Sequence, residues 1–149
     1  MAEMLLQKAT EVLQEAGVRM TPQRRVILEN LYQQKHHPTV DELFRHICNN
    51  YPGFDSLSTT TIYNNLKILK KYGLVKEIYS HTGSTRYDGN IDSHHHMVCK
   101  ACGTIIDTYY PLHLPITELQ EAESFAIDDV YVELRGLCRA CKVGNTPSE

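Results

Sequence analysis

The sequence has no apolar run that approaches the length of a membrane-spanning helix, and it has no internal repeat or low-complexity segment. Residues 1–10 also lack the basic start, apolar run and small-residue cleavage site of a secretory signal. These absences argue against a membrane protein, a repeat array and a secreted protein. We therefore expect a cytoplasmic protein whose thiols stay reduced.

Net charge is also small, because the formal value is −3, and this alone argues against a nucleic-acid partner. The charges are unevenly placed, however. Residues 1–86 carry eleven Lys and Arg against eight Asp and Glu, whereas residues 87–149 carry four against ten. Imbalances of this size are often only solvated surface, yet a basic half followed by an acidic half favours two small domains with different partners.

The first half of the sequence predicts helices. Helical spacing of apolar residues predicts helices over residues 5–16 and 22–31. A capping box from Thr39 to Glu42 then predicts the start of a third helix.

A fourth helix is predicted over residues 58–71, with Ile62, Leu66 and Leu69 as its buried stripe. Its outer face carries hydroxyl, amide and ammonium groups but no carboxylate, whereas a merely solvated face usually includes Glu or Asp. Such a face suits phosphates and base edges, so we predict a DNA-reading helix. The side chains predicted to contact DNA from it are Thr60, Tyr63, Asn64, Lys67 and Lys71.

Residues 74–79 and 85–87 predict a β-hairpin with a turn at Thr82-Gly83-Ser84, and helices followed by a hairpin predict a winged helix. The fold class is therefore α+β. We expect a winged-helix DNA-binding domain over 1–87, a polar hinge over 88–93, and a small α/β dimerisation and metal-binding domain over 94–149. In this last domain the sequence predicts a strand at 104–109, a helix after Pro115, and strands at 125–127 and 130–134.

Four of the five cysteines form two Cys-x-x-Cys pairs, Cys99 with Cys102 and Cys138 with Cys141. Each pair can direct both sulfurs at one metal ion, and two pairs supply the four donors of a closed tetrahedral shell. A redox pair or two disulfides are the alternatives, and both are disfavoured in a cytoplasmic protein. We therefore predict a structural Zn²⁺ site in the second domain.

Three consecutive histidines precede the first cysteine pair. In a strand, His94 and His96 point to one face and His95 to the other, because side chains alternate. Two imidazoles on one face are half of a metal site, and the alternative is a solvated, histidine-rich turn. The histidine residues alone do not separate these two interpretations.

Six segments together carry a family resemblance. They are Gly17-Val18-Arg19-Met20-Thr21-Pro22-Gln23-Arg24, His37-Pro38-Thr39, Thr61-Ile62-Tyr63-Asn64-Asn65-Leu66, Arg86-Tyr87-Asp88, His94-His95-His96 and Cys99-Lys100-Ala101-Cys102-Gly103. In this order, and over nearly the whole chain, they resemble the ferric uptake regulator (Fur) family of dimeric, metal-dependent bacterial transcription factors. The resemblance implies a homodimer that binds pseudo-palindromic operator DNA, with Arg19 in the minor groove and Tyr63 and Asn64 reaching bases.

The resemblance also implies a regulatory metal site. Its ligands would be His37, Asp88, His94, His96 and Asp107. Such a nitrogen and oxygen shell suits Fe²⁺ or Mn²⁺ rather than the all-sulfur environment that favours zinc. By resemblance, Asp rather than Glu at positions 88 and 107 favours the peroxide-sensing branch of the family, in which oxidation of a ligand, here His37 or His94, releases the metal and then the DNA.

Other functions stay open at this point. A sensor of iron, manganese or zinc levels without peroxide chemistry would use the same ligands. A zinc hydrolase or deaminase is disfavoured because the sequence has no His-Glu-x-x-His and no His-x-Glu with Pro-Cys-x-x-Cys, so we expect no enzyme. A zinc-stapled protein-interaction module would show no salt-sensitive DNA binding. The family often has a histidine near the position of Ser124, where it helps to build a further metal site. This chain departs from that pattern, so we expect no third metal site.

Overall fold

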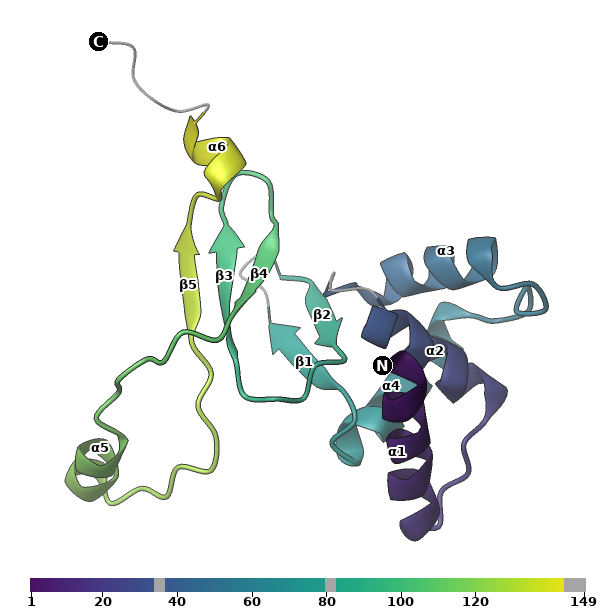
Figure 1. Ribbon diagram of the computed structural model, residues 1–149, viewed down its shortest axis with the longest axis horizontal. Helices are drawn as coiled ribbons and strands as arrows, with labels where there is room; N and C mark the ends of the chain where they lie inside the picture. Colours follow the sequence, from purple (N-terminus) through teal and green to yellow (C-terminus); the bar gives the residue numbers. More distant parts are fainter. Residues whose placement is uncertain (34–36, 80–82, 144–149) are drawn as a thin grey trace. The chain divides into compact units, whose positions relative to one another are not determined.

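The computed structural model describes residues 1–33, 37–79 and 83–143, and the chain divides into two compact units, Met1–Ile91 and Asp92–Glu149. No helix among the described residues is both long and apolar enough to cross a membrane. In chain order the elements are α1 (Ala2–Glu15), α2 (Pro22–Gln33), α3 (Val40–Asn50), α4 (Thr59–Lys71), β1 (Lys76–Tyr79), β2 (Thr85–Asp88), β3 (His95–Cys99), β4 (Ile105–Thr108), α5 (Ile116–Glu123), β5 (Glu133–Gly136) and α6 (Arg139–Val143) (Figure 1).

Helices α3 and α4 of the first unit begin at side-chain caps. The Thr39 hydroxyl accepts a hydrogen bond from the Glu42 N–H at 3.2 Å, and the Glu42 carboxylate accepts one from the Thr39 N–H at 2.9 Å. The Ser58 hydroxyl accepts a hydrogen bond from the Thr61 N–H at 3.1 Å. Each cap satisfies a backbone donor that has no partner inside its helix. The predicted capping box is therefore confirmed.

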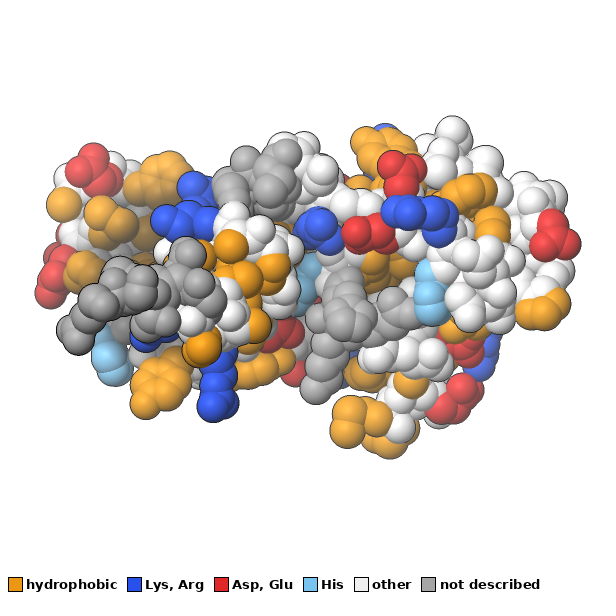
Figure 2. All heavy atoms as spheres, turned by 90° about the horizontal axis from the view of Figure 1, so that it is seen from above, with side chains coloured by type: hydrophobic (Ala, Val, Ile, Leu, Met, Phe, Trp, Pro, Cys, Tyr) orange, Lys and Arg blue, Asp and Glu red, His pale blue; other side chains and the backbone are white. Residues whose placement is uncertain are grey.

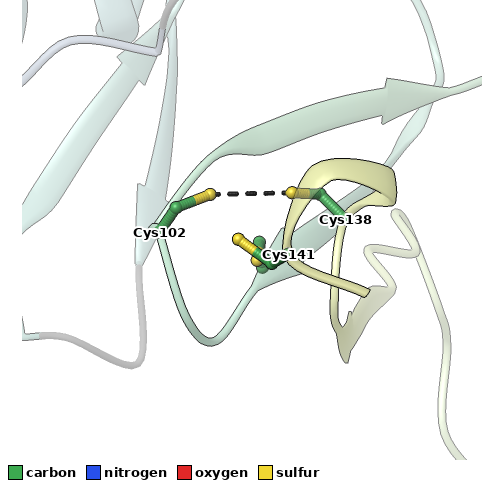
Figure 3. A group of neighbouring side chains, drawn as sticks. Cys102, Cys138 and Cys141 are labelled. Carbon is green, nitrogen blue, oxygen red and sulfur yellow. Dashed lines mark hydrogen bonds between the residues drawn. The ribbon is translucent and has the colours of Figure 1, made fainter. Parts of the chain in front are cut away.

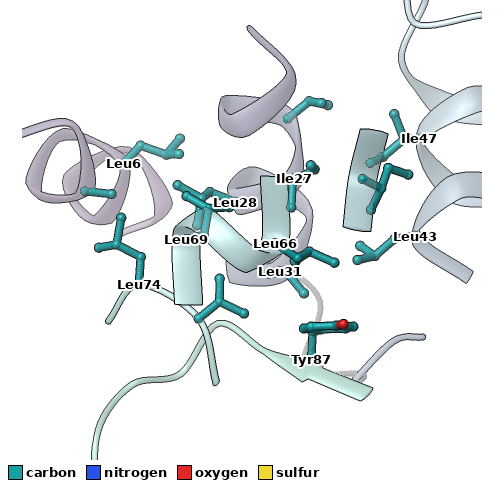
Figure 4. Packing of buried hydrophobic residues seen from close by; sticks show 14 of the residues in the cluster. Leu6, Ile27, Leu28, Leu31, Leu43, Ile47, Leu66, Leu69, Leu74 and Tyr87 are labelled. Atoms are coloured by element: carbon teal, nitrogen blue, oxygen red, sulfur yellow. The ribbon is translucent and has the colours of Figure 1, made fainter. Parts of the chain in front are cut away.

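The core of the first unit takes large side chains from every helix and from the hairpin (Figure 4). Leu6 of α1, Ile27 of α2, Leu43 of α3 and Leu66 of α4 are each at most 1% exposed. Tyr87 of β2 packs into the same cluster, and burial raises the pKa of its phenol to about 12. The predicted DNA-reading helix α4 is thus fixed by its buried stripe.

Replacing Leu66 by alanine should lower the free energy of unfolding of the first unit by about 2 to 5 kcal/mol, because it leaves a cavity in this core. Leu5→Ala is the matched control, since Leu5 is 40% exposed on α1. Urea denaturation followed by circular dichroism measures both variants. Equal losses from the two variants would contradict the packing described here.

The hairpin completes a winged helix, as the sequence predicts. Strands β1 and β2 pair antiparallel, with Lys76 opposite Asp88 and Tyr79 opposite Thr85. Of the predicted turn, Thr82 lies outside the described residues. Glu77 of β1 connects the hairpin to α4, because its carboxylate lies 2.7 Å from Lys70 Nζ.

In the second unit, the described strands form a sheet in the order β4-β3-β5 (Figure 1). β3 pairs antiparallel with β4 and parallel with β5, and Met97 lies opposite both Ile106 and Leu134. These three side chains therefore share one face of the sheet, and His96 lies on the other. They are 39%, 42% and 44% exposed, and apolar side chains are also seen at the surface in Figure 2.

Two strand predictions in this unit are wrong. Residues 125–127, all within the described part of the chain, form no strand, and the strand predicted at 130–134 is observed at Glu133–Gly136. Ser124 ends α5 in the left-handed conformation, with φ 50°. The N–H groups of Phe125 and Ile127 then donate to the main chain and side chain of Gln120. These donors are consequently used by the helix end instead of a strand partner.

Candidate functional site

The four predicted zinc ligands converge in the second unit, and Figure 3 shows three of them, Cys102, Cys138 and Cys141. Their Sγ atoms all lie within 4.8 Å of one another, and Cys102 Sγ and Cys138 Sγ are 3.7 Å apart. A tetrahedron with Zn–S bonds of about 2.3 Å has edges of about 3.8 Å. All the cysteines are free thiols, so the disulfide alternative is not formed. The cluster fits a tetrahedral Zn²⁺.

The electrostatics of the cluster agree with this fit. Hydrogen bonds from the backbone at Cys138 and Cys102 lower the pKa of Cys99 to about 6. The Thr104 hydroxyl is the main cause of a lowered pKa at Cys102. Hydrogen bonds with the other three thiols raise the pKa of Cys141 to about 12. Four thiolates at this spacing repel one another, and a divalent cation offsets that repulsion.

The neighbouring histidines of the second unit form a separate group with Asp107. His94 Nε2 and His96 Nε2 are 3.0 Å apart, and Asp107 Oδ1 lies 3.1 Å from His96 Nε2 and 3.5 Å from His94 Nε2. His96 and Asp107 are paired residues of β3 and β4. The His94 and His96 side chains are 1% and 4% exposed. Two imidazole nitrogens and a carboxylate oxygen are a suitable partial shell for Fe²⁺ or Mn²⁺.

A backbone contact orients His94 within this group. His94 Nδ1 lies 2.7 Å from the carbonyl oxygen of Asp92. A carbonyl only accepts hydrogen bonds, so Nδ1 carries the proton and the lone pair of the neutral ring is at Nε2. That nitrogen is the one that faces His96 and Asp107, and a hydrogen bond at the opposite ring nitrogen is the usual arrangement of a metal-ligating histidine.

The first unit contains the other two predicted regulatory ligands. His37 Nε2 lies 3.4 Å from Asp88 Oδ2, and their side chains are only 4% and 8% exposed. The Arg86 guanidinium donates to the His37 carbonyl at 2.9 Å, and the Tyr87 N–H donates to the Pro38 carbonyl at 2.9 Å. These two hydrogen bonds from strand β2 hold His37, which precedes α3, beside Asp88, the last residue of β2. Of the five predicted ligands, two therefore belong to the first unit and three to the second.

The predicted DNA-contacting side chains of α4 all lie on its exposed face, and Arg19 is exposed before α2. On α4 they are Thr60, Tyr63, Asn64, Lys67 and Lys71. Lys67 Nζ lies 5.7 Å from the centroid of the Tyr63 ring, a cation–π contact. The outward face of α4 is therefore available for recognition, with its apolar stripe buried in the core.

Arg24 is a residue that the sequence analysis missed. Its Nε donates to Asn65 Oδ1 of α4 at 3.1 Å, and its guanidinium also donates to the carbonyl of Arg19. Its backbone N–H donates to the Thr21 hydroxyl at 3.3 Å. Arg24 therefore connects the segment that carries Arg19 to α4. In the sequence, Thr21 followed by Pro22 is a typical helix start, which puts Arg24 in the first turn of the helix. That local pattern gives no indication of the long-range contact with Asn65.

Comparison with known proteins gives consistent results over most of the chain. The ferric uptake regulator family matches residues 15–135. A peroxide-responsive repressor PerR of Staphylococcus epidermidis is 38% identical over 138 residues, which cover 92% of this chain and 90% of that protein.

Solved structures agree with this relationship. A zinc-bound manganese uptake regulator is 30% identical with a TM-score of 0.64, covering 87% of this chain and 98% of its own. PerR from Streptococcus pyogenes, described as a structural basis for peroxide sensing and gene regulation, is 28% identical with a TM-score of 0.52, covering 91% and 92%.

Proposed function

Since the chain belongs to the ferric uptake regulator family, we propose that it is a metal-dependent transcriptional repressor of the PerR type. It binds operator DNA when Fe²⁺ or Mn²⁺ is bound and releases the DNA after peroxide oxidises a ligand. The observation that carries this proposal is the group formed by the buried His94 and His96 with Asp107, whose donor atoms lie 3.0 to 3.5 Å apart. The protein acts in the cytoplasm, where operator DNA is found.

In this proposal His37 and Asp88 of the first unit would hold the regulatory ion together with His94, His96 and Asp107 of the second. An ion held in this way would fix the angle between the two units. In a dimer that angle sets the distance between the two α4 helices, so the metal favours the conformation that matches two operator half-sites. A typical coupling of about 1 to 3 kcal/mol corresponds to a change in DNA affinity of roughly 5- to 150-fold.

The dimer is supported by the sheet of the second unit. Met97, Ile106 and Leu134 form a partly exposed apolar face of paired residues, and such a face is typical of a protein–protein interface. A second copy of the chain supplies the same apolar face. Two copies then present two α4 helices to a pseudo-palindromic operator.

On DNA, α4 enters the major groove. Asn64 is suited to a bidentate contact with adenine, whereas Lys67 and Lys71 hold phosphates and set the register. Arg19 reaches the minor groove from the segment before α2. A four-thiolate Zn²⁺ stabilises the second unit and takes no part in sensing.

Peroxide sensing follows from the ligand shell. Fe²⁺ held by these residues would supply electrons to H₂O₂ and so generate an oxidant. The ring of His37 or His94 would gain one oxygen atom at a ring carbon as the O–O bond breaks, the second oxygen would leave as water, and the oxidised ring would no longer hold the metal that DNA binding requires. Each such event consumes one protein molecule, so the process is sensing rather than enzymatic turnover.

One experiment tests this function directly. Operator affinity is measured by fluorescence anisotropy with Fe²⁺ or Mn²⁺, each with and without H₂O₂. Binding that requires either metal and is lost to peroxide only with Fe²⁺ supports the proposal. A sensor of metal levels alone is the second candidate, favoured by the similarity to the manganese uptake regulator, and it predicts that peroxide has no effect with either metal.

Arg24→Ala should weaken operator binding by roughly tenfold, because a lost hydrogen-bonding charge costs about 1.5 kcal/mol and leaves both Arg19 and Asn65 less well placed. Arg25→Ala removes the same charge from the next residue, which instead lies 3.1 Å from Glu3 of α1. Fluorescence anisotropy at fixed salt compares the two. If both variants lose the same affinity, only net charge matters and Arg24 has no positioning role.

A further inference from the structure

Two tyrosine rings lie against the metal-binding imidazoles of the second unit. The Tyr109 ring stacks on His94, with centroids 5.6 Å apart and planes at 30°. The Tyr131 ring lies 5.5 Å from His96 with planes at 48°. Tyr109 is 63% exposed and Tyr131 is 48% exposed. The function proposed above uses neither ring.

The backbone geometry explains the contact of Tyr109. It lies two residues beyond Asp107, so its side chain continues on the face of the sheet that Asp107 occupies. His95 and Thr108 are the last paired residues at this end of β3 and β4. If this register is continued by one residue on each strand, His94 and Tyr109 become cross-strand neighbours. The stacked pair therefore follows from the register of the sheet.

We propose that Tyr109 is a second oxidation site of this protein, converted to 3,4-dihydroxyphenylalanine when the iron-loaded centre meets H₂O₂. This inference rests on the proposed peroxide-sensing function. A phenol ring is oxidised more readily than an imidazole, and Tyr109 contacts the ligand beside which the oxidant forms. Tyr109 has the more nearly parallel contact and the more exposed ring of the two tyrosines.

The chemistry balances with one peroxide per tyrosine. The O–O bond of H₂O₂ and one ring C–H bond beside the phenol carbon break, and a ring C–OH bond forms. The displaced hydrogen leaves with the second oxygen as water. The ring is oxidised by two electrons and the peroxide is reduced by two. All five metal ligands stay intact, so oxidation of Tyr109 raises the peroxide dose that is needed to inactivate the repressor.

Peptide mass spectrometry of the full-length Fe²⁺-loaded protein after limited H₂O₂ tests the proposal. Fragment ions must assign the added oxygen, because oxidised histidine and hydroxylated tyrosine gain the same mass. We expect added oxygen on both His94 and Tyr109. Tyr109→Phe keeps a stacking ring but removes the phenol. Because the phenol competes for the shared oxidant with a barrier no higher than that of the imidazole, the substitution should raise oxidation of His94 by at least about twofold.

Tyr110→Phe is the matched control, since Tyr110 is the adjacent residue and is 80% exposed. Zn²⁺-loaded protein is the second control because Zn²⁺ has no redox chemistry. Oxygen on His94 with none on Tyr109, or equal oxygen on Tyr109 and Tyr110, overturns this inference and leaves the proposed function standing. Oxygen on neither histidine ligand nor tyrosine overturns both. Oxygen on Tyr109 that exceeds Tyr110 and requires iron supports the inference.

Discussion

Cys99→Ser is expected to abolish zinc binding and to unfold the second unit while the first unit stays folded. Cys99 is buried where β3 ends, and its sulfur lies within 4.8 Å of the other three. The second unit has a small sheet whose apolar face is exposed, so the metal replaces much of the stabilisation that a larger core provides. A hydroxyl in place of one thiolate removes a ligand that Zn²⁺ prefers.

Two measurements check this result. Zinc content should fall from about one ion per chain to below about 0.1, because binding and folding of such a site are coupled. Hydrogen exchange should show loss of protection in β3, β4 and β5 but not in α2 or α4. Cys48→Ser is the control, since Cys48 lies on α3 in the first unit, with its Sγ 3.9 Å from the Phe54 carbonyl. A Cys99→Ser variant with normal zinc content contradicts the four-thiolate site.

His94→Ala is expected to remove the metal dependence of DNA binding. In the unchanged protein, a typical allosteric coupling predicts that Mn²⁺ raises operator affinity roughly 5- to 150-fold. In the variant, we expect Mn²⁺ to leave operator affinity unchanged. The reason is that the variant loses the ring whose Nε2 lies 3.0 Å from His96 Nε2 and 3.5 Å from Asp107 Oδ1. Fluorescence anisotropy with increasing Mn²⁺ measures the effect, and zinc content should not change.

His95→Ala is the control for the histidine cluster. His95 Nδ1 accepts the N–H of Val132 at 3.3 Å and lies on the opposite face of β3 from His96. We expect His95→Ala to lower thermal stability slightly and to retain the full response to Mn²⁺. The regulatory role of His94 is wrong if both variants keep the response, or if both lose it equally.

Local sequence signals predicted most of the helices and the hairpin, because each depends on residues close together in the chain. The capping box of Thr39 and Glu42 fixed the start of α3 for this reason. The strand predicted at 125–127 failed because apolar residues alone do not show which partner takes their N–H groups. In the structure, Gln120 accepts two of these donors.

The candidate sites show the same contrast between features that depend on neighbouring residues and features that depend on distant ones. The Cys-x-x-Cys spacing identified all four members of the sulfur cluster, and alternation in a strand placed His94 and His96 on one face. No local pattern joins His37 to Asp88, and only the family resemblance related them. The Arg24 contact with Asn65 and the Tyr109 contact with His94 depend on how distant segments pack, so no local pattern predicts either contact.

The most direct test of the central claim is a crystal structure of the Mn²⁺-loaded protein with anomalous scattering recorded for manganese. We expect one manganese peak per chain, bound by His37 and Asp88 of the first unit together with His94, His96 and Asp107 of the second. A peak bound only by His94, His96 and Asp107, with His37 directed elsewhere, would contradict the claim that one ion connects the two units.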